Sequence, residues 1–219
     1  LMTTAESTGV RNWRVELVGG EDELIVENNR RTLQIELVDR PIRVLYVDGY
    51  PRWEYRYLKN TLVREESIAS SIMLISADRT FAQEGDVPLR RLPREAEEIA
   101  DYDVIAIGDV PADFFSPAQL ELFRDHVAVT GAGLMWLAGE RHTPGSYAST
   151  MLADLLPIRQ PSVVGALSPP LAMRPTPAAE ALGVLRLRQL GGADSASLWP
   201  VQLPDLLWGQ TLGELKPAV

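Results

Sequence analysis

The feature that most restricts the fold is an alternation of short apolar runs with segments of helical periodicity between residues 41 and 160. Residues 42–47 form a nearly continuous apolar run, which is typical of a strand buried on both faces of a parallel sheet. In the next segment, Tyr55, Leu58 and Leu62 recur at the spacing of one helix face. This alternation predicts right-handed βαβ units and therefore an α/β fold around a parallel sheet.

The same pattern continues through three more strands and three more helices. We expect the strands at residues 70–77, 102–107 and 134–138, and the helices at residues 94–101, 116–130 and 144–156. Ser116 opens a capping box, which marks a helix start. In that helix Leu120, Phe123 and Val127 form the inward stripe. His126 lies off the stripe and is expected at the surface, whereas Trp53 and Tyr57 in the first helix are expected to be packing residues.

The flanking segments have different patterns. Residues 1–40 alternate with period two, as at Trp13 and Val15, and this predicts strands joined in a hairpin. Two or three strands alone are marginally stable, so this segment needs something to pack against. Residues 161–219 are Pro-rich and show one strand candidate at 184–187. We therefore divide the chain into 1–40, 41–160 and 161–219, and expect it to be a piece of a longer protein.

Composition excludes several classes of function. Lys and Arg number 21 against 30 Asp and Glu, a net charge of −9, which disfavours binding to nucleic acid or to an anionic membrane. No apolar run is long enough for direct membrane insertion. The chain has no Cys, which excludes disulfides, thiolate metal sites and a cysteine nucleophile. The compartment stays open, because a chain without thiols is compatible with any redox environment.

Polar residues follow three of the predicted strands. Because ligands bind beyond the carboxyl ends of parallel strands, we expect these residues to meet at one rim. The candidate ligand-binding residues are Asp48, Gly49, Arg52, Asp109, Glu140 and Arg141. The helix that starts after Gly49 presents free N–H groups, and Arg52 adds a charge, so a pocket for a carboxylate or phosphate is one interpretation. In the other interpretation, Asp48 caps the helix and Arg52 pairs on its surface.

Catalysis has two candidates at this rim, Glu140 and His142. Glu140 beside His142 has the chemistry of a general base, and with Asp48 it would make a hydrolase site. In the alternative, Glu140 pairs with Arg141 and His142 is a solvated loop residue. Asp48, Asp109, Glu140 and His142 are also possible metal ligands, but no compact ligand spacing supports a metal, and we expect neither a metal nor a cofactor.

Three blocks resemble a known family. They are residues 44–56 (Val-Leu-Tyr-Val-Asp-Gly-Tyr-Pro-Arg-Trp-Glu-Tyr-Arg), residues 102–105 with Gly108-Asp109, and residues 131–134 with Ala138-Gly139. They resemble the class I glutamine amidotransferase-like domains, in the bacterial branch found with von Willebrand A-type and immunoglobulin-like modules. The resemblance implies a flavodoxin-like three-layer fold for residues 41–160. It also implies that residues 1–40 are the last strands of an immunoglobulin-like module.

The resemblance does not extend to the family's catalytic residues. Catalytic members of the family use a Cys at the turn after a strand, with a downstream His and Glu, whereas here Gly139 and Glu140 occupy the matching turn. We therefore expect a non-catalytic module, structural or binding, in a larger multidomain and envelope-associated bacterial protein. The expected partners are neighbouring modules of the same parent chain and a small anionic ligand. The alternatives are a hydrolase that uses Glu140, His142 and Asp48, and a pure spacer between β modules.

Overall fold

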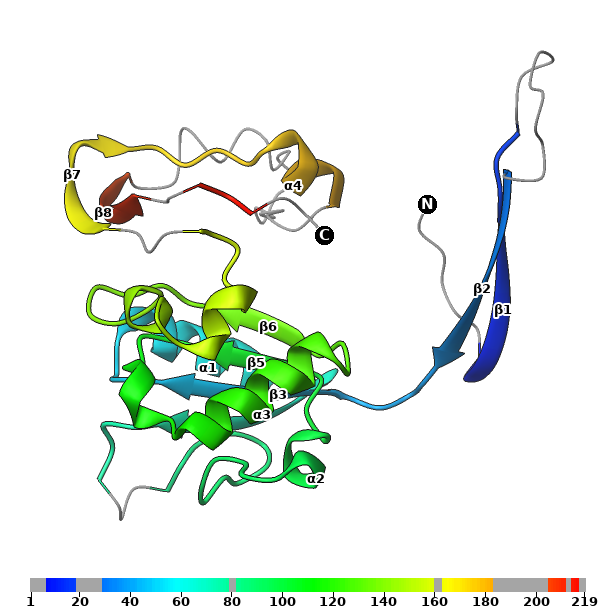
Figure 1. Cartoon of the computed structure of the whole chain (residues 1–219), viewed down its shortest axis with the longest axis horizontal. Helices are drawn as coiled ribbons and strands as arrows, with labels where there is room; N and C mark the ends of the chain where they lie inside the picture. Colours follow the sequence, from blue (N-terminus) through cyan, green and yellow to red (C-terminus); the bar gives the residue numbers. More distant parts are fainter. Residues whose placement is uncertain are drawn as a thin grey trace.

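The protein has a mixed α/β fold built on a four-stranded parallel sheet (Figure 1). The structure is a computed structural model, and it describes residues 7–18, 29–78, 82–159, 163–182, 205–211 and 214–216. The sheet has the order β4-β3-β5-β6, and its strands are β3 (Ile42–Asp48), β4 (Ile68–Leu74), β5 (Val104–Ile107) and β6 (Gly133–Trp136). The predicted α/β class and parallel strands are confirmed, with shifts of a few residues at the strand ends.

Helices cover both faces of this sheet. They are α1 (Trp53–Arg64), the short α2 (Ala96–Ile99) and α3 (Pro117–Ala128). On one face, Tyr55 and Leu62 of α1 pack against Tyr46 of β3. On the other, Phe123 of α3 packs in a larger core that includes Leu45. Since alternate residues of β3 point to opposite faces, this strand is buried on both sides, as its apolar run predicted.

Helix α3 starts as predicted but buries a residue that was expected outside. Ser116 and Gln119 form the reciprocal capping box. His126 is only 7% exposed, so its predicted surface position is wrong. One ring nitrogen lies 2.7 Å from the carbonyl oxygen of Tyr102, and the other lies 3.1 Å from the hydroxyl of Thr130. A polar ring can be buried here because both of its nitrogens have partners.

The start of α1 also differs from expectation. Pro51 precedes the helix, the N-cap residue is Arg52, and no side chain caps the helix. Trp53 and Tyr57 are 66% and 65% exposed, so their predicted role as packing residues is wrong. Their rings stack on each other with centroids 5.9 Å apart. They share a helix face at spacing i, i+4, and that face points away from the sheet on which Tyr55 packs.

The predicted helix over 144–156 is replaced by two short 3₁₀ helices, η3 (Gly145–Tyr147) and η4 (Met151–Leu155). Thr150 lies between them, and its hydroxyl accepts a hydrogen bond from the backbone N–H of Leu152. This side-chain cap starts a new turn, so the backbone does not continue as one helix. A third 3₁₀ helix, η2 (Ala112–Phe114), leads into α3.

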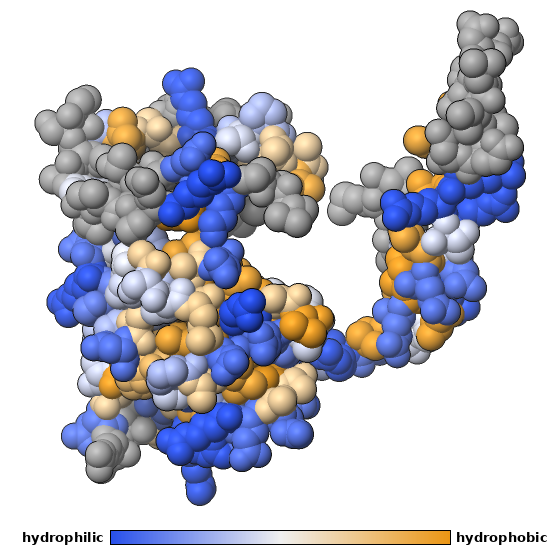
Figure 2. All heavy atoms as spheres, in the orientation of Figure 1, coloured by the Kyte–Doolittle hydropathy of each residue, from blue (hydrophilic) through white to orange (hydrophobic). Residues whose placement is uncertain are grey.

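Two antiparallel pairs of strands flank the sheet, and the first of them is a hairpin. The first pairs β1 (Gly9–Glu16) with β2 (Arg30–Leu37) and projects from the main body (Figure 2). Apolar side chains such as Val15 are exposed on it. The second pairs β7 (Val163–Leu171) with β8 (Leu206–Thr211), and α4 (Pro177–Leu182) lies between them in sequence. The strands of the first hairpin were predicted, and β7 and β8 were missed. The strand candidate at 184–187 lies outside the described residues.

None of the helices in the described part of the chain is long and apolar enough to cross a membrane.

Candidate functional site

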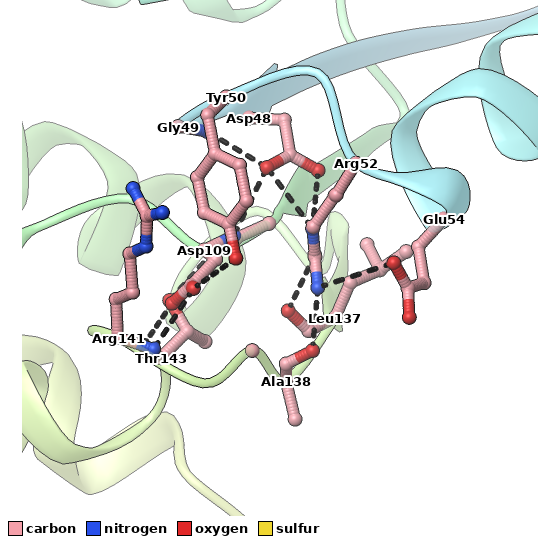
Figure 3. Close-up of polar contacts among 12 residues, drawn as sticks. Asp48, Gly49, Tyr50, Arg52, Glu54, Asp109, Leu137, Ala138, Arg141 and Thr143 are labelled. Carbon is pink, nitrogen blue, oxygen red and sulfur yellow. Dashed lines mark hydrogen bonds and ion pairs between the residues drawn. The ribbon is translucent and has the colours of Figure 1, made fainter.

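The carboxyl ends of β3, β5 and β6 meet at one rim, and the loops that follow them bring the predicted site residues together (Figure 3). Asp48 is the last residue of β3, and Asp109 follows β5 by two residues. The third group, residues 139–143, belongs to the loop after β6. The contacts among these residues show what each of them does at the rim.

The carboxylate of Asp48 is fully buried and has partners on both oxygens. Its Oδ1 accepts hydrogen bonds from the backbone N–H groups of Gly49 (2.7 Å) and Asp109 (3.2 Å). Its Oδ2 accepts one from the hydroxyl of Tyr46 (2.6 Å). Burial, followed by the nearby negative charge of Asp48, raises the pKa of Tyr46 far above its ordinary value, so this hydroxyl stays a donor.

Arg52 completes the environment of Asp48 and joins it to β6. Its Nε lies 3.3 and 3.2 Å from the two oxygens of Asp48. Its Nη1 donates to the carbonyl of Ala138 (2.7 Å) and its Nη2 to that of Leu137 (3.1 Å). The Arg52 side chain is only 7% exposed, so the guanidinium belongs to the interior of the rim. The interpretation in which Asp48 caps the helix and Arg52 pairs on its surface is therefore wrong.

Asp109 holds the loop after β6. Its Oδ1 accepts from the backbone N–H groups of His142 (2.7 Å) and Thr143 (2.9 Å). Its Oδ2 accepts from the N–H of Arg141 (3.0 Å) and from the hydroxyl of Tyr50 (3.2 Å). Burial acts to raise the pKa of Asp109, but the hydrogen bonds from these backbone groups outweigh it and hold the pKa below its ordinary value. Asp109 is therefore an anion enclosed by three successive N–H groups.

Three glycines make these close contacts possible. A Cβ on Gly49 would overlap the backbone carbonyl of Asp109, and one on Gly108 would overlap the carboxylate of Asp48. A Cβ on Gly139 would overlap the carboxylate of Asp109. Only a residue without a side chain leaves room for the carbonyl that Gly49 faces and for the carboxylates that Gly108 and Gly139 face. The pairs Asp48-Gly49 and Gly108-Asp109 were visible in the sequence as this signal.

The outer part of the rim is more open. Glu140 is exposed and has no hydrogen-bond or ion-pair partner among the described residues, so the suggested pair with Arg141 does not form. The guanidinium of Arg141 instead lies 4.1 Å above the ring of Tyr50. His142 is half-buried and uses its backbone N–H to bind Asp109. Within the described ranges, no group of three or more His, Cys, Asp or Glu side chains could hold a metal ion.

A groove of about 640 Å³ opens beside the rim, between the start of α1 and the loop after β6. Its lining includes Tyr50, Trp53, Arg56, Glu140, Arg141 and Trp208. Trp208 comes from β8, and Gln210 of the same strand binds β8 to the loop by donating to the carbonyls of Gly139 (2.7 Å) and Thr143 (2.9 Å). Sequence reasoning missed Trp208, because no local pattern connects β8 to a loop about 70 residues earlier.

No protein-family model, no curated protein and no solved structure matches this chain.

Proposed function

We propose that this chain is a non-catalytic glutamine amidotransferase-like module of flavodoxin-like fold, and that it binds a small anionic ligand in the groove beside the rim. One observation carries the proposal. The polar groups of the rim bind one another and the backbone, as Asp48 does with Arg52 and Asp109 with residues 141–143. Together with the absence of Cys from the chain, this leaves the rim with a structural role.

The outer groove supports the binding part of the proposal. Arg56 and Arg141 line it, and neither forms an ion pair with another described residue. The groove therefore contains two guanidinium groups that are not paired with a described carboxylate. They favour an anionic ligand, because Arg binds carboxylates and phosphates through paired hydrogen bonds.

The first hairpin supports the proposed origin in a larger multidomain bacterial protein. Trp13, Val15, Leu33 and Ile35 share one face of the hairpin in the observed register, and Val15 and Leu33 are about half exposed. A two-stranded hairpin with an apolar face needs a further layer to be stable. A preceding immunoglobulin-like module of the same parent chain would supply that layer.

The hydrolase alternative uses Glu140 and His142 with Asp48 as catalytic residues. Asp48 weighs against it, because its carboxylate is fully buried and engaged by Tyr46, Gly49, Arg52 and Asp109, so it cannot assist Glu140 as a general base at the substrate. We expect the purified chain to be inert toward a panel of ester, amide and phosphate substrates, with and without divalent ions. Turnover that is lost in Glu140→Gln would favour the hydrolase instead.

Two measurements test the proposal. The chain is incubated with glutamine, and ammonia is measured against a blank without protein; release above the blank would contradict a non-catalytic module. Calorimetric titration with acetate, phosphate and citrate then tests for an anion site. We expect at least one of these anions to bind wild type more tightly than Arg56→Gln, and no binding of any anion would contradict the binding part.

A further inference from the structure

We infer that the groove binds an acidic sugar, that is, a sugar ring with several hydroxyls and one carboxylate. The ring lies between Trp53 and Trp208, and the carboxylate binds Arg141. This inference rests on the proposed function of the chain as a binding module. It adds the chemical class of the ligand and assigns the groove residues that recognise each part of it.

The aromatic lining suits a ring. Trp53 is 66% exposed and Trp208 is half-buried, and both contribute to the same groove from different elements, α1 and β8. The ring of Trp53 is backed by Tyr57 at 5.9 Å, which limits its rotation. Tyr57 and Arg56 cover part of the Trp53 ring, and the rest of its indole surface and that of Trp208 are flat and apolar. The C–H faces of a sugar ring pack well on such a surface.

The two arginines in the groove that have no ion-pair partner among the described residues can bind one carboxylate of a ligand. Arg141 is held over Tyr50 at 4.1 Å and Arg56 over Trp53 at 5.8 Å. The other basic residues of the groove are already neutralised, since Arg52 pairs with Asp48 and Lys59 with Glu84. Two guanidiniums held over aromatic rings are already oriented, so their N–H groups can bind a carboxylate with little loss of side-chain entropy.

The carboxylates that line the groove favour a ligand with hydroxyl groups over a ligand with several negative charges. Glu54 and Glu140 are exposed and line the same space, and Glu54 forms a long ion pair of 3.9 Å with Arg52. Two carboxylates against two available guanidiniums would repel a polyanion such as a polyphosphate. They would accept hydrogen bonds from the hydroxyls of a ligand with one negative charge.

The test compares four probes by calorimetry and by NMR of the indole N–H groups: sodium glucuronate, glucose, benzoate and inorganic phosphate. Glucuronate is expected to bind at least about tenfold more tightly than each of the other three, because only it has the ring, the hydroxyls and the acid group. Glucuronate is also expected to shift the indole resonances of Trp53 and Trp208.

Variants assign the binding to the groove. Arg141→Gln and Trp53→Ala are each expected to weaken glucuronate binding about tenfold or more, and Trp53→Phe to retain most of it. Arg64→Gln and Val63→Ala change the same helix outside the groove and are expected to leave binding unchanged. Circular dichroism confirms that each variant is folded.

Several results would overturn the inference. Glucose binding as tightly as glucuronate would show that the acid group is not recognised. Equal binding of benzoate would show the same for the hydroxyls, and equal binding of phosphate the same for the sugar ring. Glucuronate binding that survives both Arg141→Gln and Trp53→Ala would place the ligand elsewhere. Binding of phosphate or citrate without glucuronate would overturn the inference and leave the proposed function intact, whereas ammonia release from glutamine would overturn the proposed function.

Discussion

The backbone N–H of Asp109 donates a 3.2 Å hydrogen bond to the carboxylate of Asp48, which joins the loop after β5 to the end of β3. The carboxylate of Asp109 in turn accepts the N–H groups of residues 141–143 in the loop after β6. The two aspartates thus connect three strand ends in series. This arrangement makes the rim a source of stability, and the first two predictions follow from it.

We expect Asp48→Asn to lower the free energy of unfolding by about 3–5 kcal/mol, because it removes the buried anionic partner of Arg52 and leaves only the exposed Glu54, 3.9 Å away. Urea unfolding followed by tryptophan fluorescence measures the change. Asp101→Asn is the control, because it removes the partner of Arg43 in an exposed pair and should change stability by less than about 1 kcal/mol. Similar losses in both variants would contradict the structural role of Asp48.

We expect Gly139→Ala to lower the free energy of unfolding by about 3 kcal/mol, because its Cβ would overlap the carboxylate of Asp109. Gly145→Ala is the matched control, since a Cβ at Gly145 has open space around it. The control should change stability by less than about 1 kcal/mol. Chemical unfolding of both variants measures the difference, and a tolerated Gly139→Ala would show that the loop does not approach Asp109 this closely.

Ser116→Ala should lower the free energy of unfolding by about 1 kcal/mol, because its hydroxyl accepts the backbone N–H of Gln119 at the start of α3. Ser149→Ala removes a hydroxyl from an exposed residue and should stay within about 0.5 kcal/mol of wild type. Thermal and urea unfolding both report the difference. Equal stability of the two variants would mean that the capping box contributes nothing.

Arg40→Gln should raise the pKa of Asp103. Two hydrogen bonds from Arg40, at 2.6 and 2.7 Å, hold the pKa of Asp103 at about 2, below its ordinary 3.8. Because the folded-state pKa is lower, this carboxylate contributes stability that is fully present above pH 3.8 and is lost as the pH falls through about 2. NMR titration of the Asp103 carboxyl carbon in wild type and Arg40→Gln measures the shift.

The control for this titration is Arg14→Gln. Arg14 lies on the first hairpin with Glu16 as its ion-pair partner, so the change should leave the pKa of Asp103 as it is in wild type. An unchanged pKa in Arg40→Gln would mean that Arg40 does not hold Asp103 in solution.

Local sequence signals were sufficient for the parallel strands and for the start of α3. The apolar run 42–47 and the capping box at Ser116 involve neighbouring residues only, so the sequence carries them directly. The same reasoning failed for His126, whose burial depends on the carbonyl of Tyr102 in another part of the chain. It failed again for the 144–156 segment, where the hydroxyl of Thr150 starts a new turn.

The location of the candidate site could be predicted from the sequence, but the contacts within it could not. The carboxyl ends of parallel strands share one edge of the sheet. The parallel direction of the strands therefore brings together Asp48, Asp109 and the loop that contains Glu140. The sequence contained no sign that Trp208 would line the groove, because β8 reaches it from the far end of the chain.

By itself, the sequence determined the α/β class, the four parallel strands and the edge where polar residues gather, since each depends on periodicity or on strand direction. Only the tertiary structure decided that Arg52 would bind Asp48 and the carbonyl of Leu137, 85 positions along the chain. A buried guanidinium takes whichever acceptors the packed backbone places around it, and that placement is a property of the folded chain as a whole.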